Sequence, residues 1–392
     1  MNINKDSVES YLEEFTCDAN SLINIKLIRT EDEIDKCIGF APQFTHQFYG
    51  ESEKIFGYKN LRIDLCFSAH SLTPFISSSY DVKVENTEDI LADNFEHSLI
   101  DKLSNVERNL ESFKNIVKND TCKCYGKLID QYTLNENVYE TYHIYESELE
   151  SPAFQLFNER LQYLLLFFVD GSSFIDVNDP SWEYFVIYQK YKDADLSFKY
   201  ATIGFLTVFN FFAYPDKVRK RISQVLILPP FQKQGHGERL LTIFYNTALA
   251  NLNLKDITVE DPSDQFQILR DFVDCKNVLS LKEFKVDTIK NSLFKKFRSL
   301  VHSKLKISNQ QIIRIYEILG LKFVNKLNVV EGMKYKYSVI KRLTDVFGKT
   351  KDFSVGNQAV LEMNDEEKSI LFEREYERLE QCYSIIIMKL DK

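Results

Sequence analysis

A short loop with two glycines, set between an apolar run and a helical pattern, offers the first chemistry. The run from Gln224 to Leu228 is followed by Pro229-Pro230, which should end a strand, and then by the loop Gln232 to Gly237. The first amides of a helix are unpaired and its dipole favours negative charge, so the strand, loop and helix predict an anion site that fits a pyrophosphate. Gly235 and Gly237 would let the backbone approach the phosphates. The pattern Q-x-x-G-x-G alone also fits an ordinary glycine turn, and it matches neither the GK[ST] phosphate loop nor GxGxxG.

Cysteine and histidine spacing gives no support to metal chemistry. The seven cysteines are an odd number spread through a long chain, which predicts reduced thiols. The close pair Cys122 and Cys124 has a one-residue spacer, which is poor geometry for tetrahedral zinc. The six histidines never fall at ligand spacing. We therefore expect no metal.

The elements that must position the loop are predicted from their patterns. INIKLI and LRIDLCF alternate like strands, with the helix-favouring EDEIDKCI between them, and indicate an α/β amino-terminal module. A helix is expected from Ser151-Pro152, running into an apolar strand. Mostly antiparallel strands are then expected in FFVDGSSF, WEYFVIYQKY, YATIGFLTVFNFF, RISQVLILPPF and DITVEDP. Beyond Pro262 the chain should be mainly helical, with one helix that starts at Ser308 and stops at Gly320 and another in EEKSILFEREYERLEQ.

Composition and charge limit the class of protein. The 392 residues are 44% hydrophobic and 14% aromatic, which excludes a disordered tail or a collagen-like fibre. The longest apolar run has seven residues, Tyr163 to Val169, against the ~20 of a membrane-spanning helix. No secretory signal is visible in MNINKDSVESYLEEF, so an intracellular protein without a membrane partner is expected.

The net charge of −9 is unevenly distributed. From Lys282 to Lys351 there are 17 lysines and arginines against five acidic residues, so the rest of the chain carries −21. An acidic body attracts cationic partners and repels nucleic acid, so no sequence-specific nucleic acid is expected. The basic segment is interpreted as a solvated helical face, although it could contact phosphates.

Several motifs in one order carry a family resemblance. The loop resembles the coenzyme A loop of the GCN5-related N-acetyltransferase superfamily. Together with THQFYGESEKIFGYK, SFIDVNDPSWEYF, FNFFAYPDK, DITVEDP and RIYEILGL, the stretch SQVLILPPFQKQGHGERLL resembles the type B histone acetyltransferase catalytic subunits over the whole chain. The resemblance implies an α/β (α+β) fold whose acetyltransferase core has a mixed, mostly antiparallel sheet flanked by helices. We expect an α/β domain at 1–150, an acetyl-CoA-binding core at 151–275 and a mainly helical domain at 276–392.

The resemblance also implies an activity, partners and site residues. It implies acetylation of lysines in the amino-terminal tail of newly made histone H4, a WD40 histone-binding partner, and a place in nucleus and cytoplasm. Acetyl-CoA would be bound by Val225, Leu226, Ile227, Gln232, Lys233, Gln234, Gly235, His236, Gly237 and Glu238. The peptide groove would be lined by Trp182, Phe209, Asn210, Phe211, Glu51, Ser52 and Glu53. The catalytic residues would be Glu260 as general base, with Asp261 and Asp170 beside it.

The residues themselves support a carboxylate base. A free lysine with a pKa near 10.4 is only ~0.04% deprotonated at pH 7, so a base must take its proton. Glu260 ends the strand Ile257 to Val259 just before Pro262, and burial beside Asp261 or Asp170 would raise its pKa toward neutrality. No cysteine lies in the loop or at this turn, so direct attack in a ternary complex is expected rather than an acetyl-enzyme. The sequence leaves open which carboxylate accepts the proton, and whether the chain is instead an assembly subunit with little catalysis or acts on another amine.

Overall fold

The chain forms two compact units. The computed structural model describes residues 13–85, 87, 90–120, 124–134, 140–149, 151–193, 197–291, 293–324, 328–347 and 364–392. The first unit comprises Met1–Asn210 and Ile222–Ile243, and the second comprises Phe211–Arg221 and Phe244–Lys392. The predicted three-part division at 150 and 275 stays a prediction. Among the described residues no helix combines the length and apolarity needed to cross a bilayer.

The first unit begins with a three-stranded sheet. Its strands β2 (Ile23–Ile28) and β5 (Arg62–Ser68) are parallel, and β6 (Pro74–Ser79) pairs antiparallel with β5. Helices α3 (Glu33–Lys36) and α6 (Leu110–Asn119) cover it, and Ile28, Ile34, Cys66, Phe75, Phe113 and Val117 form their common core. The predicted strands INIKLI and LRIDLCF and the helix between them are confirmed. Short elements complete this part: β1 (Thr16–Asp18), α2 (Ala19–Leu22), α4 (His46–Tyr49), β3 (Lys54–Phe56), β4 (Tyr58–Lys59), β7 (Val82–Lys83) and α5 (Phe95–Lys102).

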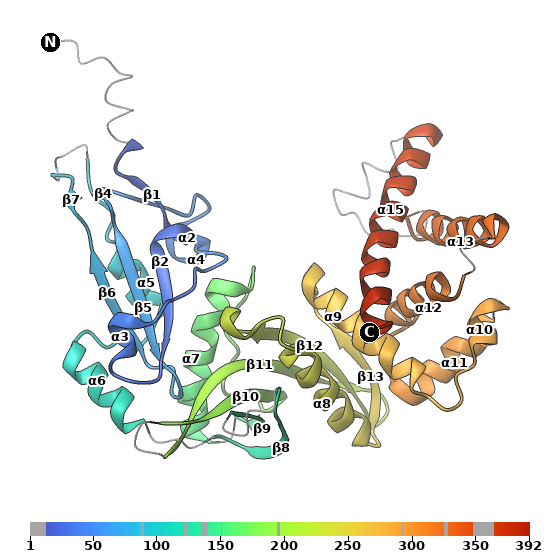
Figure 1. Ribbon diagram of the computed structural model, residues 1–392, viewed down its shortest axis with the longest axis horizontal. Helices are drawn as coiled ribbons and strands as arrows, with labels where there is room; N and C mark the ends of the chain where they lie inside the picture. The colour runs from blue at the N-terminus through green and yellow to red at the C-terminus, as the bar shows by residue number, and fades with distance from the viewer. Residues whose placement is uncertain are drawn as a thin grey trace, which may run out of the picture. The chain divides into compact units, whose positions relative to one another are not determined.

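A larger sheet follows in the first unit, with its strands in the order β12-β11-β10-β9-β8 (Figure 1). Pairing is antiparallel from β8 through β11. The predicted strands after residue 180 are confirmed, whereas β8 and β9 lie in a stretch for which no strand was predicted. The strands are β8 (Lys127–Tyr132), β9 (Thr141–Glu148), β10 (Trp182–Lys192), β11 (Phe198–Ala213) and β12 (Lys217–Ile227).

Helix α7 (Pro152–Phe168) packs on one face of this sheet and corrects one prediction. The strand predicted at FFVDGSSF is wrong, because the helix continues to Phe168 and a turn follows. Phe154 and Phe157 contact Tyr184 and Tyr188 of β10 across 5.1 and 6.2 Å between ring centroids. The run from Tyr163 to Phe168 is buried throughout, and a helix buried on all sides is as continuously apolar as a buried strand.

The second unit is mainly helical, and the helices predicted beyond Pro262 are found in its described residues. Strand β13 (Leu254–Val259) lies beside the first residues of β12, where the Val218 amide donates to the Asn253 carbonyl. Helix α12 (Asn309–Phe323) packs against α9, α10, α11, α13 and α15. The other helices are α9 (Asp264–Leu279), α10 (Val286–Lys290), α11 (Phe294–Leu305), α13 (Val329–Phe347) and α15 (Asp365–Leu390).

Both ends of α12 were predicted, and one prediction is wrong. The Ser308 hydroxyl accepts a hydrogen bond from the Gln311 amide, so Ser308 is the N-cap as expected. The helix does not stop at Gly320 but continues to Phe323. A Cβ at Gly320 would lie 3.1 Å from a ring carbon of Tyr335 on α13. The glycine therefore allows close packing of α12 and α13 and does not end the helix.

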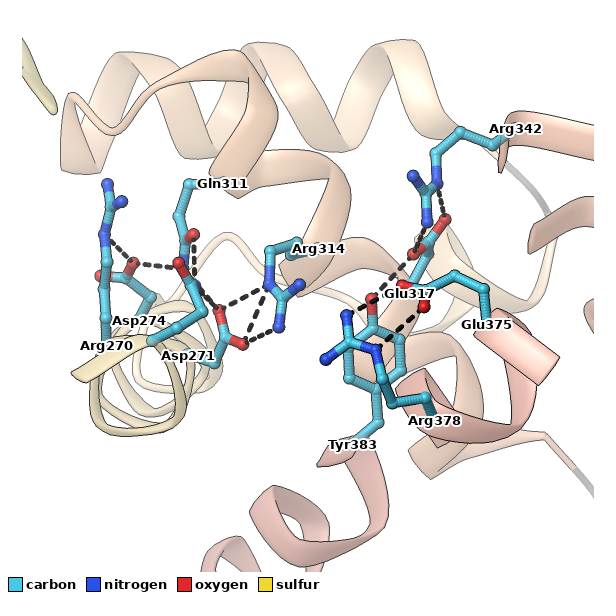
Figure 2. A network of polar contacts seen from close by, with 11 residues as sticks. Arg270, Asp271, Asp274, Gln311, Arg314, Glu317, Arg342, Glu375, Arg378 and Tyr383 are labelled. Atoms are coloured by element: carbon cyan, nitrogen blue, oxygen red, sulfur yellow. Dashed lines mark hydrogen bonds and ion pairs between the residues drawn. The ribbon is translucent and has the colours of Figure 1, made fainter. Parts of the chain in front are cut away.

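A buried polar network joins α9, α12, α13 and α15 (Figure 2). Asp271, with a fully buried side chain, accepts hydrogen bonds from Gln311 and Arg314. Glu317 accepts two from Arg342 and one from the Tyr383 hydroxyl. Each pair joins two different helices, so the network fixes their packing.

Candidate active site

The predicted cofactor residues lie in the first unit, on β12, in the loop after it and in the first turn of the helix that follows. Val225 and Ile227 are half-buried and Leu226 is buried, since side chains alternate along the strand. A 3₁₀ turn, η1 (Pro229–Phe231), and then the loop lead into α8 (His236–Ala250), which begins two residues earlier than predicted. The expected order of strand, glycine loop and helix is confirmed.

Side chains of the loop shape it from within. The Gln232 amide donates to the Ile227 carbonyl at 2.8 Å, and the Gln234 amide donates to the Pro230 carbonyl at 2.8 Å. Lys233 and Gly235 have φ of 60° and 95°, and a Cβ added at Gly235 would meet nothing within 4 Å. Gly235 is therefore required for its backbone conformation rather than for space. Positive φ values beside a helix start favour an amide-lined concavity, which fits a pyrophosphate group.

His236 has a different place from the one expected of a phosphate-binding side chain. It is 1% exposed, and its Nδ1 lies 2.7 Å from the Tyr132 hydroxyl of β8. Its ring lies 4.4 Å from that of Tyr142 on β9. Burial lowers the pKa of His236 to about 4, so the ring is neutral at pH 7. The side chain anchors the loop to the sheet and supplies no positive charge, although its backbone amide still belongs to the first turn of α8.

The first turn of α8 is also fixed by an ion pair. Arg239 contacts both carboxylate oxygens of Asp130 on β8 at 2.6 Å. Gly237 and Glu238 are half-buried between these two anchors. His236, at the start of α8, packs against Tyr142, which is the cross-strand partner of Gln189 on β10. Gln189 points to one face of the sheet, whereas Tyr184 and Tyr188, which contact α7, point to the other. The start of α8 therefore lies on the sheet face opposite to α7.

Asp170 lies in the turn after α7 and faces His46. Its side chain is 74% exposed, and its Oδ1 is 3.6 Å from Nε2 of His46. The other ring nitrogen of His46 is 3.7 Å from Glu53. The next turn residues also contact α4, because the Gln47 amide donates to the Ser172 carbonyl. His46 was not predicted as a site residue, and its partners are 7 and 124 positions away.

The acidic stretch at 51–53 divides into exposed and structural residues. Glu51 and Ser52 are both exposed. Glu53, at φ 51°, accepts hydrogen bonds from the amides of Thr45 and His46 and from the Asn20 side chain. These donors, first the Thr45 amide, lower the pKa of Glu53. Glu53 thus holds the start of α4, and Glu51 is the carboxylate of this stretch left open to a ligand.

Three of the predicted groove residues come together on β10 and β11. Trp182 and Phe209 are cross-strand partners with ring centroids 5.0 Å apart, edge to face. Asn210 donates to Glu183 through its side chain at 2.8 Å and to the Ser181 carbonyl through its amide. Trp182 and Phe209 remain half-buried, so an aromatic surface is accessible near the start of β10 and the end of β11.

The second unit holds Glu260, Asp261 and Phe211. Glu260 directly follows β13, as predicted, and Asp261 has a φ of 29° in the turn before Pro262. The expected burial of Glu260 is not found, because its side chain is 49% exposed. Nη1 of Arg221 lies 3.9 Å from Glu260, and the guanidinium lies 4.6 Å from the centre of the Phe211 ring. Arg221 therefore links a predicted catalytic residue to a predicted groove residue.

Arg221 was missed because nothing local marks it. It is one of four cations in the strand segment KVRKRIS, and only the pairing of β12 with β13 singles it out. Its neighbour Arg219, two residues earlier, pairs instead with Asp256 at 2.6 and 2.8 Å. A strand alternation count could have placed both arginines on one face but could not have assigned their partners.

Two family models match the chain. Residues 15–170 match the model described as "Histone acetyl transferase HAT1 N-terminus", and residues 270–321 match "Histone acetyltransferase type B catalytic subunit, C-terminal". The chain is 33% identical to the histone acetyltransferase type B catalytic subunit of Rattus norvegicus, over 98% of this chain and 94% of that one. It is 32% identical to the subunit of Homo sapiens with the same coverage, and 27% identical to that of Candida albicans over 96% and 90%.

Solved structures give a weaker likeness. An aminoglycoside acetyltransferase from an uncultured soil metagenomic sample, in complex with trehalose, is 17% identical with a TM-score of 0.27. The match covers 38% of this chain and 95% of that one.

Proposed function

Since the chain belongs to the family of type B histone acetyltransferase catalytic subunits, an acetyltransferase family, we propose that it transfers acetyl from acetyl-CoA to lysine side chains in the histone H4 tail. Acetyl-CoA would supply the acetyl group as a thioester. The observation that carries the proposal is the similarity over 98% of the chain to the Rattus norvegicus subunit.

Glu260 is proposed as the general base. The lysine must lose a proton before it can attack, and a carboxylate at a strand end can accept it. Glu260 is half-exposed, so a long side chain can reach it from solvent. Arg221 contacts it and packs on Phe211, which would hold the carboxylate in one orientation. Asp261 and Asp170 are proposed to attract the incoming ammonium.

The cofactor would be held by β12 and the start of α8. The backbone of Val225, Leu226 and Ile227 is proposed to contact the pantetheine arm. The amides from Gln232 to Glu238 are proposed to bind the pyrophosphate, with Lys233, exposed in the loop, as the nearby cation. The neutral, buried His236 keeps this loop in place.

The peptide would lie along Trp182, Phe209, Asn210 and Phe211, with Glu51 offering a negative charge to a basic tail. The acidic body supports a cationic substrate. A WD40 histone-binding subunit is proposed as partner, with H4 presented together with its partner core histone. Nucleus and cytoplasm are the proposed compartments.

The test is transfer of labelled acetyl from acetyl-CoA by the purified chain, with an H4 tail peptide and spermidine as competing acceptors. Transfer to the peptide with the higher kcat/KM is expected. Preference for spermidine would show that another amine is the substrate. Peptide binding without any transfer at saturating acetyl-CoA would mean that the chain is an assembly subunit.

A further inference from the structure

Helix α13 of the second unit carries an exposed apolar stripe. Val329, Val330, Met333 and Tyr337 are 67%, 60%, 66% and 69% exposed. Residues of this size are rarely exposed together along one helix, and such patches mark interaction surfaces. The described helices α12 and α15 contact α13 through Tyr335, Lys336 and Arg342, which are not among these four residues.

The stripe has the spacing of a coiled-coil seam. Val330, Met333, Tyr337, Ile340 and Thr344 follow one another at intervals of three, four, three and four residues. This alternation is the a/d repeat by which one helix packs along another. We call these five residues the α13 seam. Ile340 is half-buried and Thr344 is exposed, so the seam extends over four turns of the helix.

The other side of α13 is already anchored within the unit. Val339 and Leu343 are 1% and 5% exposed, and Arg342 holds Glu317 of α12 through two hydrogen bonds (Figure 2). The Tyr335 hydroxyl donates to the Glu317 carbonyl at 3.0 Å. The helix is therefore held rigidly by one face while it presents the other. A preformed surface of this kind binds with little ordering cost.

Charge along the seam defines the kind of partner. Lys334 and Lys341 occupy both e positions of the repeat and are exposed. Lys336 occupies a g position and pairs with Glu373 of α15 at 2.5 Å. The acidic residues Glu331 and Asp345 fall at b positions, away from the seam. Residues at e and g contact the flanking charges of a partner helix, so a partner with glutamate or aspartate there is favoured.

The same charges oppose pairing with a second copy. In a parallel pair Lys336 of one helix would face Lys341 of the other, and in an antiparallel pair the e positions would face each other. Both arrangements place lysine against lysine, which costs free energy. A lipid surface favours an amphipathic helix whose polar sides are all exposed to water. The α13 seam is a narrow stripe on a helix that is packed on its other side, so it suits a partner helix better than a lipid surface.

We propose that the α13 seam is a docking site for an acidic amphipathic helix of another protein, with apolar residues in heptad spacing. This site is separate from the residues assigned to acetyl transfer and does not rest on the proposed function. Helix-in-groove recognition of this type uses apolar anchors for affinity and flanking charges for specificity.

The test uses two synthetic 21-residue helices with leucine at a and d, one with glutamate and one with lysine at e and g. Fluorescence anisotropy measures their binding to the full chain. The glutamate helix should bind the wild type, and Lys334→Glu/Lys341→Glu should weaken it about tenfold or more, equal to ~1.4 kcal/mol. The same double variant should gain binding of the lysine helix. Lys295→Glu/Lys296→Glu on α11, with the same change of charge at exposed positions, should alter neither.

Tyr337→Asp should abolish binding of the glutamate helix. Ser338 is exposed at the next position of α13, and the control variant Ser338→Asp should still bind that helix. The proposal is overturned if the glutamate helix fails to bind, or binds the Lys334→Glu/Lys341→Glu variant equally well. Sedimentation showing a dimer that Tyr337→Asp disrupts would assign the seam to a second copy. Binding to phosphatidylserine vesicles that Tyr337→Asp removes would assign it to a membrane.

Discussion

At the scale of single residues, His236 shows how a side chain in a functional loop can be structural. Its pKa of about 4 results from burial against Tyr132 and Tyr142. The unfolded chain would bind a proton near pH 6.5, so the unfolded state gains protons first as the pH falls. The contribution of His236 to stability is therefore complete above pH 6.5 and is lost as the pH falls toward 4.

His236→Phe should remove this pH dependence while keeping the aromatic packing. Between pH 7 and pH 5 the variant should lose about 1 to 2 kcal/mol less stability than the wild type. Urea unfolding at the two pH values measures the difference. His97→Phe, at a position whose side chain is 66% exposed, is the control and should follow the wild type. If His236→Phe and the wild type lose the same stability between pH 7 and pH 5, His236 is not buried and neutral as described.

Two arginines on β12 separate a structural role from a catalytic one. Arg221→Gln should lower kcat about tenfold with little loss of stability, because it removes the contact to Glu260 between half-exposed groups. Arg219→Gln should instead cost about 1 to 2 kcal/mol, because it leaves the buried Asp256 without its partner, and should retain the rate. Steady-state kinetics and thermal unfolding of both variants test this. A rate loss in Arg219→Gln equal to that in Arg221→Gln would refute a special role of Arg221.

At the scale of elements, the packing of α9 and α12 depends on a buried carboxyl group. Burial raises the pKa of Asp274 to about 6, although Arg270, 3.6 Å away, and Gln311 favour its charged form. The folded state thus holds a proton on Asp274 at pH values where the unfolded state has lost it. The contribution of Asp274 to stability is present below pH 4 and is lost as the pH rises through 6. This pH dependence is opposite in sign to that of His236.

Asp274→Asn should flatten this dependence. From pH 5 to pH 8 the wild type should lose about 1 kcal/mol that the variant keeps. Comparing the two pH values cancels the constant cost of leaving Arg270 with a neutral partner. Unfolding of the second unit, followed by hydrogen exchange in α9 and α12, is the measurement. If the stability of Asp274→Asn changes between pH 5 and pH 8 by as much as that of the wild type, the raised pKa of Asp274 is contradicted.

At the scale of the whole molecule, charge should influence the choice of substrate. The net charge of −9 conceals an acidic body and a basic segment from 282 to 351. Attraction of a basic tail by the body is screened within about 10 Å at 0.1 M salt. Raising the salt from 50 to 300 mM should therefore increase KM for an H4 tail peptide several-fold and leave kcat nearly constant. A peptide in which every lysine except the acetylated one is replaced by glutamine should show a smaller change of KM. Equal salt dependence for both peptides would exclude attraction by the acidic body.

Much of the fold could be predicted because its signals are local. The strands β10 to β13, the glycine loop and the Ser308 cap follow from alternation, helix-breaking residues and capping side chains in short windows. The end of α7 could not be predicted, because a continuous apolar run is shared by buried helices and buried strands. The partners of His236, His46 and Arg221 could not be predicted either. Each depends on strand register or on residues up to 124 positions away, which no local pattern records.

The most direct measurement of the central claim is acetyl transfer to an H4 tail peptide by Glu260→Gln across pH 6 to 9, with acetyl-CoA binding measured in parallel. Glutamine keeps the size of the side chain but cannot accept the proton. We expect normal acetyl-CoA binding and a loss of kcat of about 100-fold or more, the size typical of a general base. Glu283→Gln, an exposed carboxylate that pairs with Lys304, should keep the full rate. A rate for Glu260→Gln within a few-fold of the wild type would contradict the assignment of Glu260 as the base.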